Sequence, residues 1–161
     1  MLGIPRSRDI PAGSPAGTKP EDSLEMLVHR AIAASAIYRS DDGICTANFP
    51  EVGSRNAPAL LNVQTLRLGP STSTLKIKAA LWKFGYRPAI AWELAYYIEH
   101  GWDSEATIVA LGSAVRPSVA FAYVPVLSRR EAGYGLQREL HLEDAYFAKW
   151  NGLHQFLALP R

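Results

Sequence analysis

Cysteine is nearly absent from this sequence: Cys45 stands alone, so no disulfide can form within the chain. This fits a reducing compartment such as the cytoplasm, where structural disulfides are rare. No apolar run approaches the roughly 18 residues of a membrane-spanning helix, and the first residues lack the apolar core of a signal peptide. We therefore expect a cytoplasmic protein that has no membrane partner.

The motifs that reveal catalysis or ligand binding by their spacing are also missing. The sequence has no glycine-rich phosphate loop, no Cys-x-x-Cys pair, no Gly-x-Ser-x-Gly turn and no His-Glu-x-x-His helix. It therefore assigns no catalytic residue, no cofactor and no metal.

An excess of either charge is lacking as well. There are 17 Lys and Arg against 15 Asp and Glu, a net charge of +2, and the two signs read as interleaved. Nucleic acids select strongly basic surfaces, so a nucleic-acid partner is not expected. Two helices expected at 75–84 and 88–100 invite comparison with a helix-turn-helix. The second carries two glutamates and no Lys or Arg past Arg87, so contact with phosphates is unfavourable.

What is present is enough apolar material for one core: 48% of the 161 residues are hydrophobic. Residues 1–20 differ from the rest, because they contain four prolines and a Pro-Ala-Gly tandem repeat. Such a segment buries too little apolar surface to offset its ordering entropy. The expected organisation is a flexible Pro/Gly/Ser-rich N-terminal arm at 1–20 and a single α+β domain at 21–161.

Hydrophobic periodicity predicts the elements of this domain. Its fold class is α+β, with an antiparallel sheet of about four or five strands packed with three or four helices. Helices are predicted at 21–40, 75–84, 88–100 and 142–156; strands are predicted at 44–49, 60–68, 106–111, 119–127 and 134–142, and 128–133 is the predicted hairpin loop.

The stretch RPAIAWELAYYIEHGW, from Arg87 to Trp102, is the most distinctive. Pro88 suits the first turn of a helix, and Gly101 suits its end. Trp92 and Tyr96 fall away from the main apolar face. Aromatic residues at helical spacing mostly fill cores or interfaces.

Tyr, Trp and Arg are enriched where proteins bind each other. We therefore predict partner binding by three aromatic residues of this stretch and two arginines of the arm, namely Trp92, Tyr96, Trp102, Arg6 and Arg8.

Two weaker chemical patterns do not amount to a site. His141 and Glu143 share one face of a predicted strand, but zinc needs three or four ligands, and nothing in the spacing shows that His154 or His100 completes the set. Glu93 and Glu99 cannot form an acid–base pair, because six helical residues turn them about 120° apart.

The strings YYIEHGW and AYFAKWNGLHQF resemble segments of the small subunit of RuBisCO, a family with a helix ending in Gly-Trp. The resemblance implies a non-catalytic assembly subunit. It is confined to these strings, which a long segment separates, and we assign no family on it.

The sequence favours a non-catalytic protein-interaction or assembly subunit that binds another protein or itself in an oligomer or complex. The alternative is a small-molecule-binding protein or enzyme with a pocket between the aromatic helix 88–100 and the sheet. A third option is nucleic-acid binding through the arm's Arg6, Arg8 and Lys19. An interaction subunit predicts an exposed apolar patch, whereas an enzyme predicts a pocket with converging polar side chains.

Overall fold

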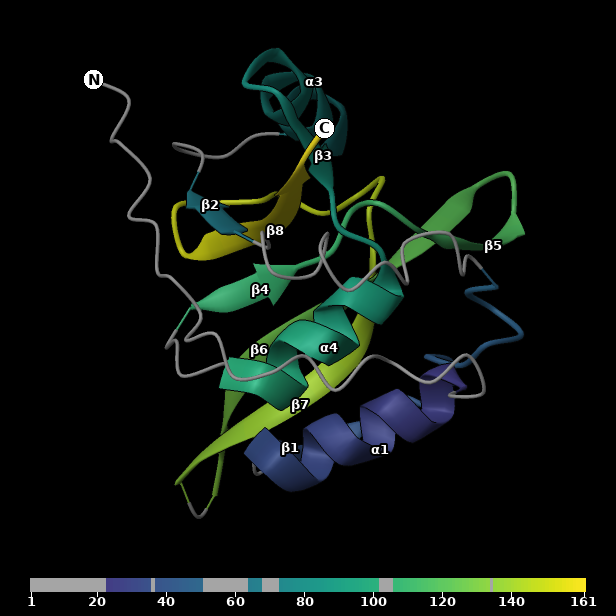
Figure 1. Ribbon diagram of the computed structural model, residues 1–161, viewed down its shortest axis with the longest axis vertical. Helices are drawn as coiled ribbons and strands as arrows, with labels where there is room; N and C mark the ends of the chain where they lie inside the picture. Colours follow the sequence, from purple (N-terminus) through teal and green to yellow (C-terminus); the bar gives the residue numbers. More distant parts are fainter. Residues whose placement is uncertain (1–22, 36, 51–63, 68–72, 102–105, 134) are drawn as a thin grey trace.

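The computed structural model describes residues 23–35, 37–50, 64–67, 73–101, 106–133 and 135–161 (Figure 1). These residues form three helices and one mixed sheet of eight strands. The helices are α1 (Leu24–Ser35), α3 (Thr74–Lys83) and α4 (Ala91–Gly101); the strands are β1 (Ile37–Ser40), β2 (Gln64–Arg67), β3 (Tyr86–Pro88), β4 (Thr107–Val109), β5 (Val115–Ser118), β6 (Phe121–Ala132), β7 (Gly135–Asp144) and β8 (His154–Pro160).

The strand order is β1-β7-β6-β4-β8-β2, with β3 also paired to β8 and β5 also paired to β6. The protein is α+β as predicted, but the antiparallel sheet of four or five strands is wrong. β1 runs parallel to β7 and β4 runs parallel to β8, while the remaining pairs are antiparallel. Parallel pairing joins segments far apart in the sequence, and no local pattern encodes it.

Two hydrophobic clusters lie on opposite faces of the sheet. Neighbouring residues of a strand point to opposite faces, and Ile108 and Leu157 belong to one cluster while Val109 and Phe156 belong to the other. The first cluster contains residues of α1 and α4, and the second contains those of α3. Figure 1 shows α1 and α4 side by side, with α3 at the other end of the molecule.

The predicted hairpin is confirmed, but its loop is shorter than expected. β6 and β7 pair without interruption from Tyr123 opposite Asp144 to Ala132 opposite Gly135. Most of the predicted loop 128–133 therefore belongs to β6, because its polar side chains can face solvent on an antiparallel sheet.

The predicted helix at 142–156 is wrong. β7 continues to Asp144, a turn follows, and β8 begins at His154. β8 is bordered by β4 on one side and by β2 and β3 on the other, and its residues Phe156 to Leu159 are buried. A strand covered on both faces has an unbroken apolar run, which periodicity cannot distinguish from a buried helix.

Three smaller predictions are also corrected. The first helix ends at Ser35, and its predicted last turn is instead β1. Residues 44–49 form turns rather than a strand, with the amides of Asn48 and Phe49 both donating to the Cys45 carbonyl. Pro88 ends β3 instead of starting the next helix.

Among the described residues, no helix is long and apolar enough to cross a membrane.

Candidate functional site

Helix α3 has a buried face that fixes it to the sheet. Ser73 caps its first turn by accepting from the Lys76 amide, and Gly85 follows its end with a φ of 81°, as predicted for a left-handed glycine. Ile77 and Leu81 lie one turn apart and are fully buried in the cluster that contains Phe156. The confirmed helix therefore needs no further apolar surface to fold.

A second apolar row nevertheless runs along its exposed side. Leu75 is 79% exposed and Trp82 is 58% exposed, and the exposed Ala79 lies between them in sequence. Steps of four and three residues place the three within about 60° of arc on a helix. We call Leu75, Ala79 and Trp82 the α3 stripe. A surface helix ordinarily carries polar residues opposite its core face, so this stripe is surplus to the fold.

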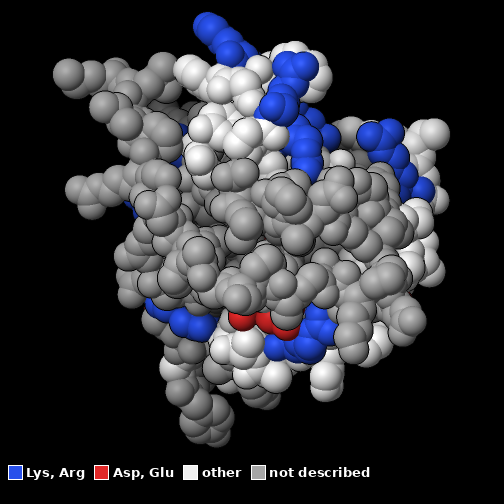
Figure 2. All heavy atoms as spheres, in the orientation of Figure 1, with Lys and Arg blue, Asp and Glu red and all other residues white. Residues whose placement is uncertain are grey.

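A row of lysines borders the α3 stripe. Lys76 and Lys83 are both exposed, and a separation of seven residues aligns them within about 20°. No carboxylate among the described residues pairs with either lysine. Figure 2 shows blue Lys and Arg atoms over the α3 end of the visible face, and red atoms only lower down.

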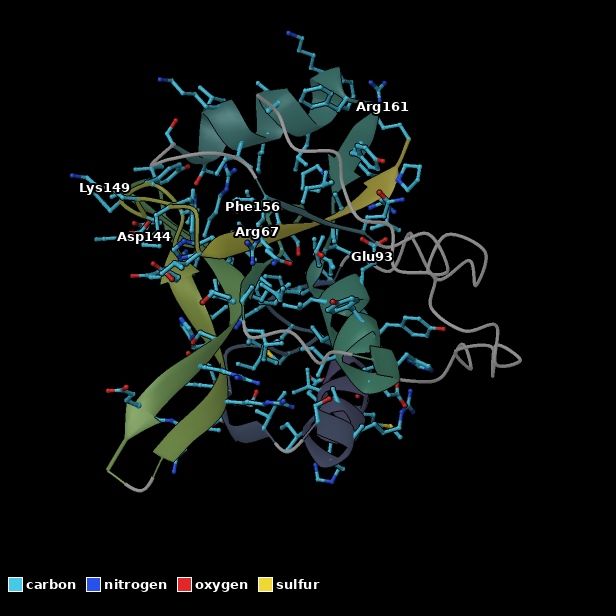
Figure 3. All side chains as sticks on the ribbon, turned by 90° about the vertical axis from the view of Figure 1, so that its left-hand side faces the viewer. Arg67, Glu93, Asp144, Lys149, Phe156 and Arg161 are labelled. Atoms are coloured by element: carbon cyan, nitrogen blue, oxygen red, sulfur yellow. The ribbon has the colours of Figure 1, made fainter. Side chains whose placement is uncertain are left out.

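Trp82 is held by the residue that follows β8. The guanidinium carbon of Arg161 lies 3.3 Å from the centroid of the Trp82 ring, a cation–π contact. The Arg161 amide donates to the Gly85 carbonyl at 3.0 Å, which fastens the end of the chain to the end of α3. Figure 3 shows Arg161 beside the end of this helix. The indole is therefore both exposed and restrained.

The other end of α3 is fixed by two partly buried hydrogen bonds that share the Thr74 hydroxyl. The Thr74 hydroxyl donates to the Ala145 carbonyl at 2.6 Å and accepts from the Trp150 indole at 2.7 Å. Trp150 itself is buried. Because both ends are anchored, the α3 stripe is presented on a rigid element.

Two of the predicted partner-binding residues, Trp92 and Tyr96, lie on α4. Trp92 is only 5% exposed, and its indole donates to the Phe49 carbonyl at 2.9 Å. Tyr96 is 7% exposed and stacks on the His100 ring, with centroids 4.0 Å apart. Burial raises the pKa of Tyr96, and the nearby charge of Glu99 adds to this.

The remaining predicted partner contacts, Trp102, Arg6 and Arg8, lie outside the described residues. Neither Trp92 nor Tyr96 is part of the α3 stripe, and partner binding by all five residues stays a prediction.

Helix α4 packs tightly where the alternative interpretation expects a pocket. Its side chains Leu94, Ala95 and Ile98 are buried in the cluster beneath it. At its start, Glu93 accepts two hydrogen bonds from the Arg87 guanidinium and one from the Ile90 amide. This carboxylate completes the first turn of the helix.

The strand face that carries His141 is polar and open. His141 Nε2 lies 3.8 Å from Glu143 Oε2, and its Nδ1 lies 3.5 Å from the Ser128 hydroxyl. Hydrogen bonding to His141 lowers the pKa of Glu143. Beside them is a hollow of about 290 Å³, lined by Arg39, Ser40, Asp41, Asp42, Glu139 and His141. Within the described part of the chain, no three His, Cys, Asp or Glu residues are placed to hold a metal.

One sequence signal identifies the α3 surface. Residues 52–92 contain no Asp or Glu, although they include six Lys and Arg residues: Arg55, Arg67, Lys76, Lys78, Lys83 and Arg87. The interleaving of charges expected from the composition does not extend to this segment. Sequence reasoning followed the buried face of α3 and missed both this charge segregation and the α3 stripe.

No protein-family model matches the chain, and neither the curated proteins nor the solved structures contain a significant match.

Proposed function

We propose that this protein is a non-catalytic interaction or assembly subunit of the cytoplasm, and that the α3 stripe contacts its protein partner. The observation that supports it is the exposure of Leu75 and Trp82 on a helix whose other face is already buried. The single cysteine agrees with a reducing compartment.

Energetics favour a partner for this surface. Burying a large apolar side chain yields about 1.5–3 kcal/mol, and Trp is the residue type most often found at the energetic centre of interfaces. A rigid helix loses little conformational freedom on binding, because both ends of α3 are already anchored. These energetic terms support a contact between the α3 stripe and a protein partner.

The alternative of an enzyme with a pocket beneath α4 has less support. Leu94 and Ile98, which face the sheet there, are packed into the core. The polar hollow beside β1 and β7 is lined by charges of both signs and holds no assigned nucleophile. We therefore keep the interaction subunit as the single proposal.

The test compares the wild-type chain with a Leu75→Ala/Trp82→Ala variant. Each tagged chain is used to capture proteins from an extract of its source, and the captured proteins are quantified. Leu153→Ala is the matched control, because Leu153 is 73% exposed but lies on the turn before β8. We expect partners that bind the wild type and the control but not the α3 variant.

Thermal melting of all three chains accompanies this test. Equal melting temperatures show that a loss of capture comes from the surface and not from unfolding. The same partners on the wild type and the α3 variant would refute the proposed function.

The arm is proposed as a second contact. Residues 1–20 lie outside the described residues, and their role rests on their composition. A chain that begins at Glu21 should melt like the full chain but assemble less, as measured by sedimentation. Unfolding of the shortened chain would instead make the arm part of the domain.

A further inference from the structure

We infer that the α3 stripe binds an amphipathic helix of the partner whose apolar row is flanked by acidic residues about seven positions apart. This inference rests on the proposed function and specifies the chemistry of the partner. It is carried by two parallel rows on α3: the apolar row from Leu75 to Trp82 and the cationic row of Lys76 and Lys83.

The two rows have the same spacing. Seven residues of α-helix rise about 10.5 Å, so Leu75 and Trp82 are separated along the axis as far as Lys76 and Lys83. A partner helix that packs along α3 repeats its own side chains at the same interval. One apolar row and one acidic row on the partner can therefore meet both rows of α3 simultaneously.

Side-chain size in the α3 stripe also suits a helix. The small Ala79 falls between the large Leu75 and Trp82, so the centre of the stripe allows close approach. Docked helices ordinarily use anchors spaced by three, four and seven residues. A flat or extended partner would not reproduce this interval.

The positive charge beside the α3 stripe determines which kind of partner helix is favoured. The cationic row is exposed, and no described carboxylate neutralises it. A partner helix with acidic residues beside its apolar row is attracted by these two lysines, whereas one with basic residues there is repelled. The segment 52–92, which includes α3, contains no Asp or Glu that could neutralise these lysines.

A second copy of the chain is disfavoured as the partner at this surface. If two α3 helices packed antiparallel about a two-fold axis, their lysine rows would face each other. If they packed parallel, each row would face the other copy's Lys78, which lies on the opposite flank of the stripe by helical geometry. Either arrangement places like charges together.

A nucleic-acid partner would leave most of this surface unused. Arg161 already stacks on the Trp82 ring, so that face is not open to a base, and Leu75 and Ala79 gain nothing from phosphates. An acidic helix uses the apolar row and the lysines together.

The experiment selects helix-forming peptides displayed on phage against the immobilised full chain. Three baits are compared: wild type, Lys76→Glu/Lys83→Glu and Leu75→Ser/Trp82→Ser. The wild type should enrich peptides with an apolar row and Asp or Glu at seven-residue spacing. The charge-reversed bait should enrich Lys or Arg at those positions, and the stripe variant should enrich neither.

The best acidic peptide is then measured by fluorescence anisotropy. Charge reversal of both lysines should weaken its binding about tenfold, the effect of roughly two rim ion pairs turned repulsive. The net-charge control is Arg39→Glu/Arg116→Glu, two exposed cations on β1 and β5. This control should bind within about twofold of the wild type.

Each other outcome overturns a distinct claim. Enrichment of apolar helices without an acidic preference refutes this inference and leaves the proposed function standing. Identical enrichment on all three baits refutes both. Vesicles that contain phosphatidylserine and a single DNA strand of mixed sequence are tested as well. If either binds more tightly than the acidic peptide, and this binding depends on Lys76 and Lys83, that ligand would replace the acidic helix. If the chain dimerises and the Leu75→Ser/Trp82→Ser change abolishes the dimer, the partner would be a second copy of the chain instead of an acidic helix.

Discussion

The buried carboxylate of Glu93 accepts two hydrogen bonds from the guanidinium of Arg87, at 2.6 and 3.0 Å. Glu93 is fully buried, whereas Arg87 keeps partial contact with solvent. The Glu93 Oε2 also accepts from the Ile90 amide at 2.9 Å, so the pair closes the start of α4 and links it to β3. Figure 3 marks Glu93 near the start of this helix. Strand and helix are joined here by charge as well as by packing.

Removing one partner of this ion pair should be costly. Arg87→Ala leaves a buried carboxylate without its counter-charge, and breaking a buried pair costs about 3–5 kcal/mol. We expect a loss of that size in the free energy of unfolding, measured by urea denaturation. The control is Arg30→Ala, whose partner Glu99 is partly exposed. Arg30→Ala should lower the free energy of unfolding by about 1 kcal/mol or less. Equal decreases for the two variants would show that burial does not determine the cost of breaking an ion pair.

The same truncation should cost much more stability on the buried face of α3 than on its exposed face. Leu81→Ala removes a fully buried side chain and should destabilise the fold by about 2–5 kcal/mol. Leu94→Ala on α4 should do the same. Leu75→Ala, in the same helix as Leu81, should change stability by less than about 0.5 kcal/mol because Leu75 is exposed. Denaturant midpoints measure all three, and a large loss at Leu75 would mean that its surface is already covered.

Local signals were sufficient to predict α3. Its apolar residues repeat at helical spacing, serines and threonines precede it, and Gly85 terminates it with a positive φ. These features act within one or two turns, so neighbouring residues encode them. The β6–β7 hairpin was predictable for the same reason, because its partners are adjacent in sequence.

The central part of the sheet could not be predicted in this way. β8 takes its place because it pairs with β4, β2 and β3, all distant in sequence. Its neighbouring aromatic residues, such as Tyr146, Phe147 and Trp150, mimic helical spacing by chance. Asn151-Gly152, a frequent turn pair, was the local signal against that helix.

The candidate site was missed for a different reason. Periodicity identifies the strongest apolar face of a helix, and Ile77 and Leu81 account for it. The exposed face of Leu75 and Trp82 is visible only when burial is known. The missing carboxylates of residues 52–92 were readable in the sequence and indicate where a basic surface forms.

Gly112 marks a point where two backbones approach too closely for any side chain. Its amide donates to the Ala89 carbonyl at 2.7 Å, and a Cβ there would lie 2.5 Å from the Pro88 oxygen. Gly112→Ala must therefore displace backbone and should cost about 1–3 kcal/mol or more. Gly152→Ala is the control, because no atom beyond the glycine and its two chain neighbours lies within 4 Å of an added Cβ there. Equal melting temperatures for the two variants would contradict this packing.

The last prediction concerns Glu25 at the start of α1. Its carboxylate accepts from the Thr46 hydroxyl at 2.6 Å and from the Thr46 amide at 3.0 Å. These bonds favour the charged form and lower the pKa of Glu25 to about 2 from an ordinary 4.5, with the hydroxyl as the largest cause. Because the pKa is lowered on folding, the stabilisation is complete above pH 4.5 and is lost as the pH falls towards 2.

Thr46→Val deletes the hydroxyl and keeps the amide. The pKa of Glu25 should then rise towards 4.5 without reaching it, because the Thr46 amide still donates. A side-chain NMR titration of Glu25 measures this directly. Thr107→Val, on β4, is the matched control and should leave the Glu25 titration unchanged. An ordinary pKa for Glu25 in the wild-type chain would show that the contact between α1 and the turn at Thr46 does not form in solution.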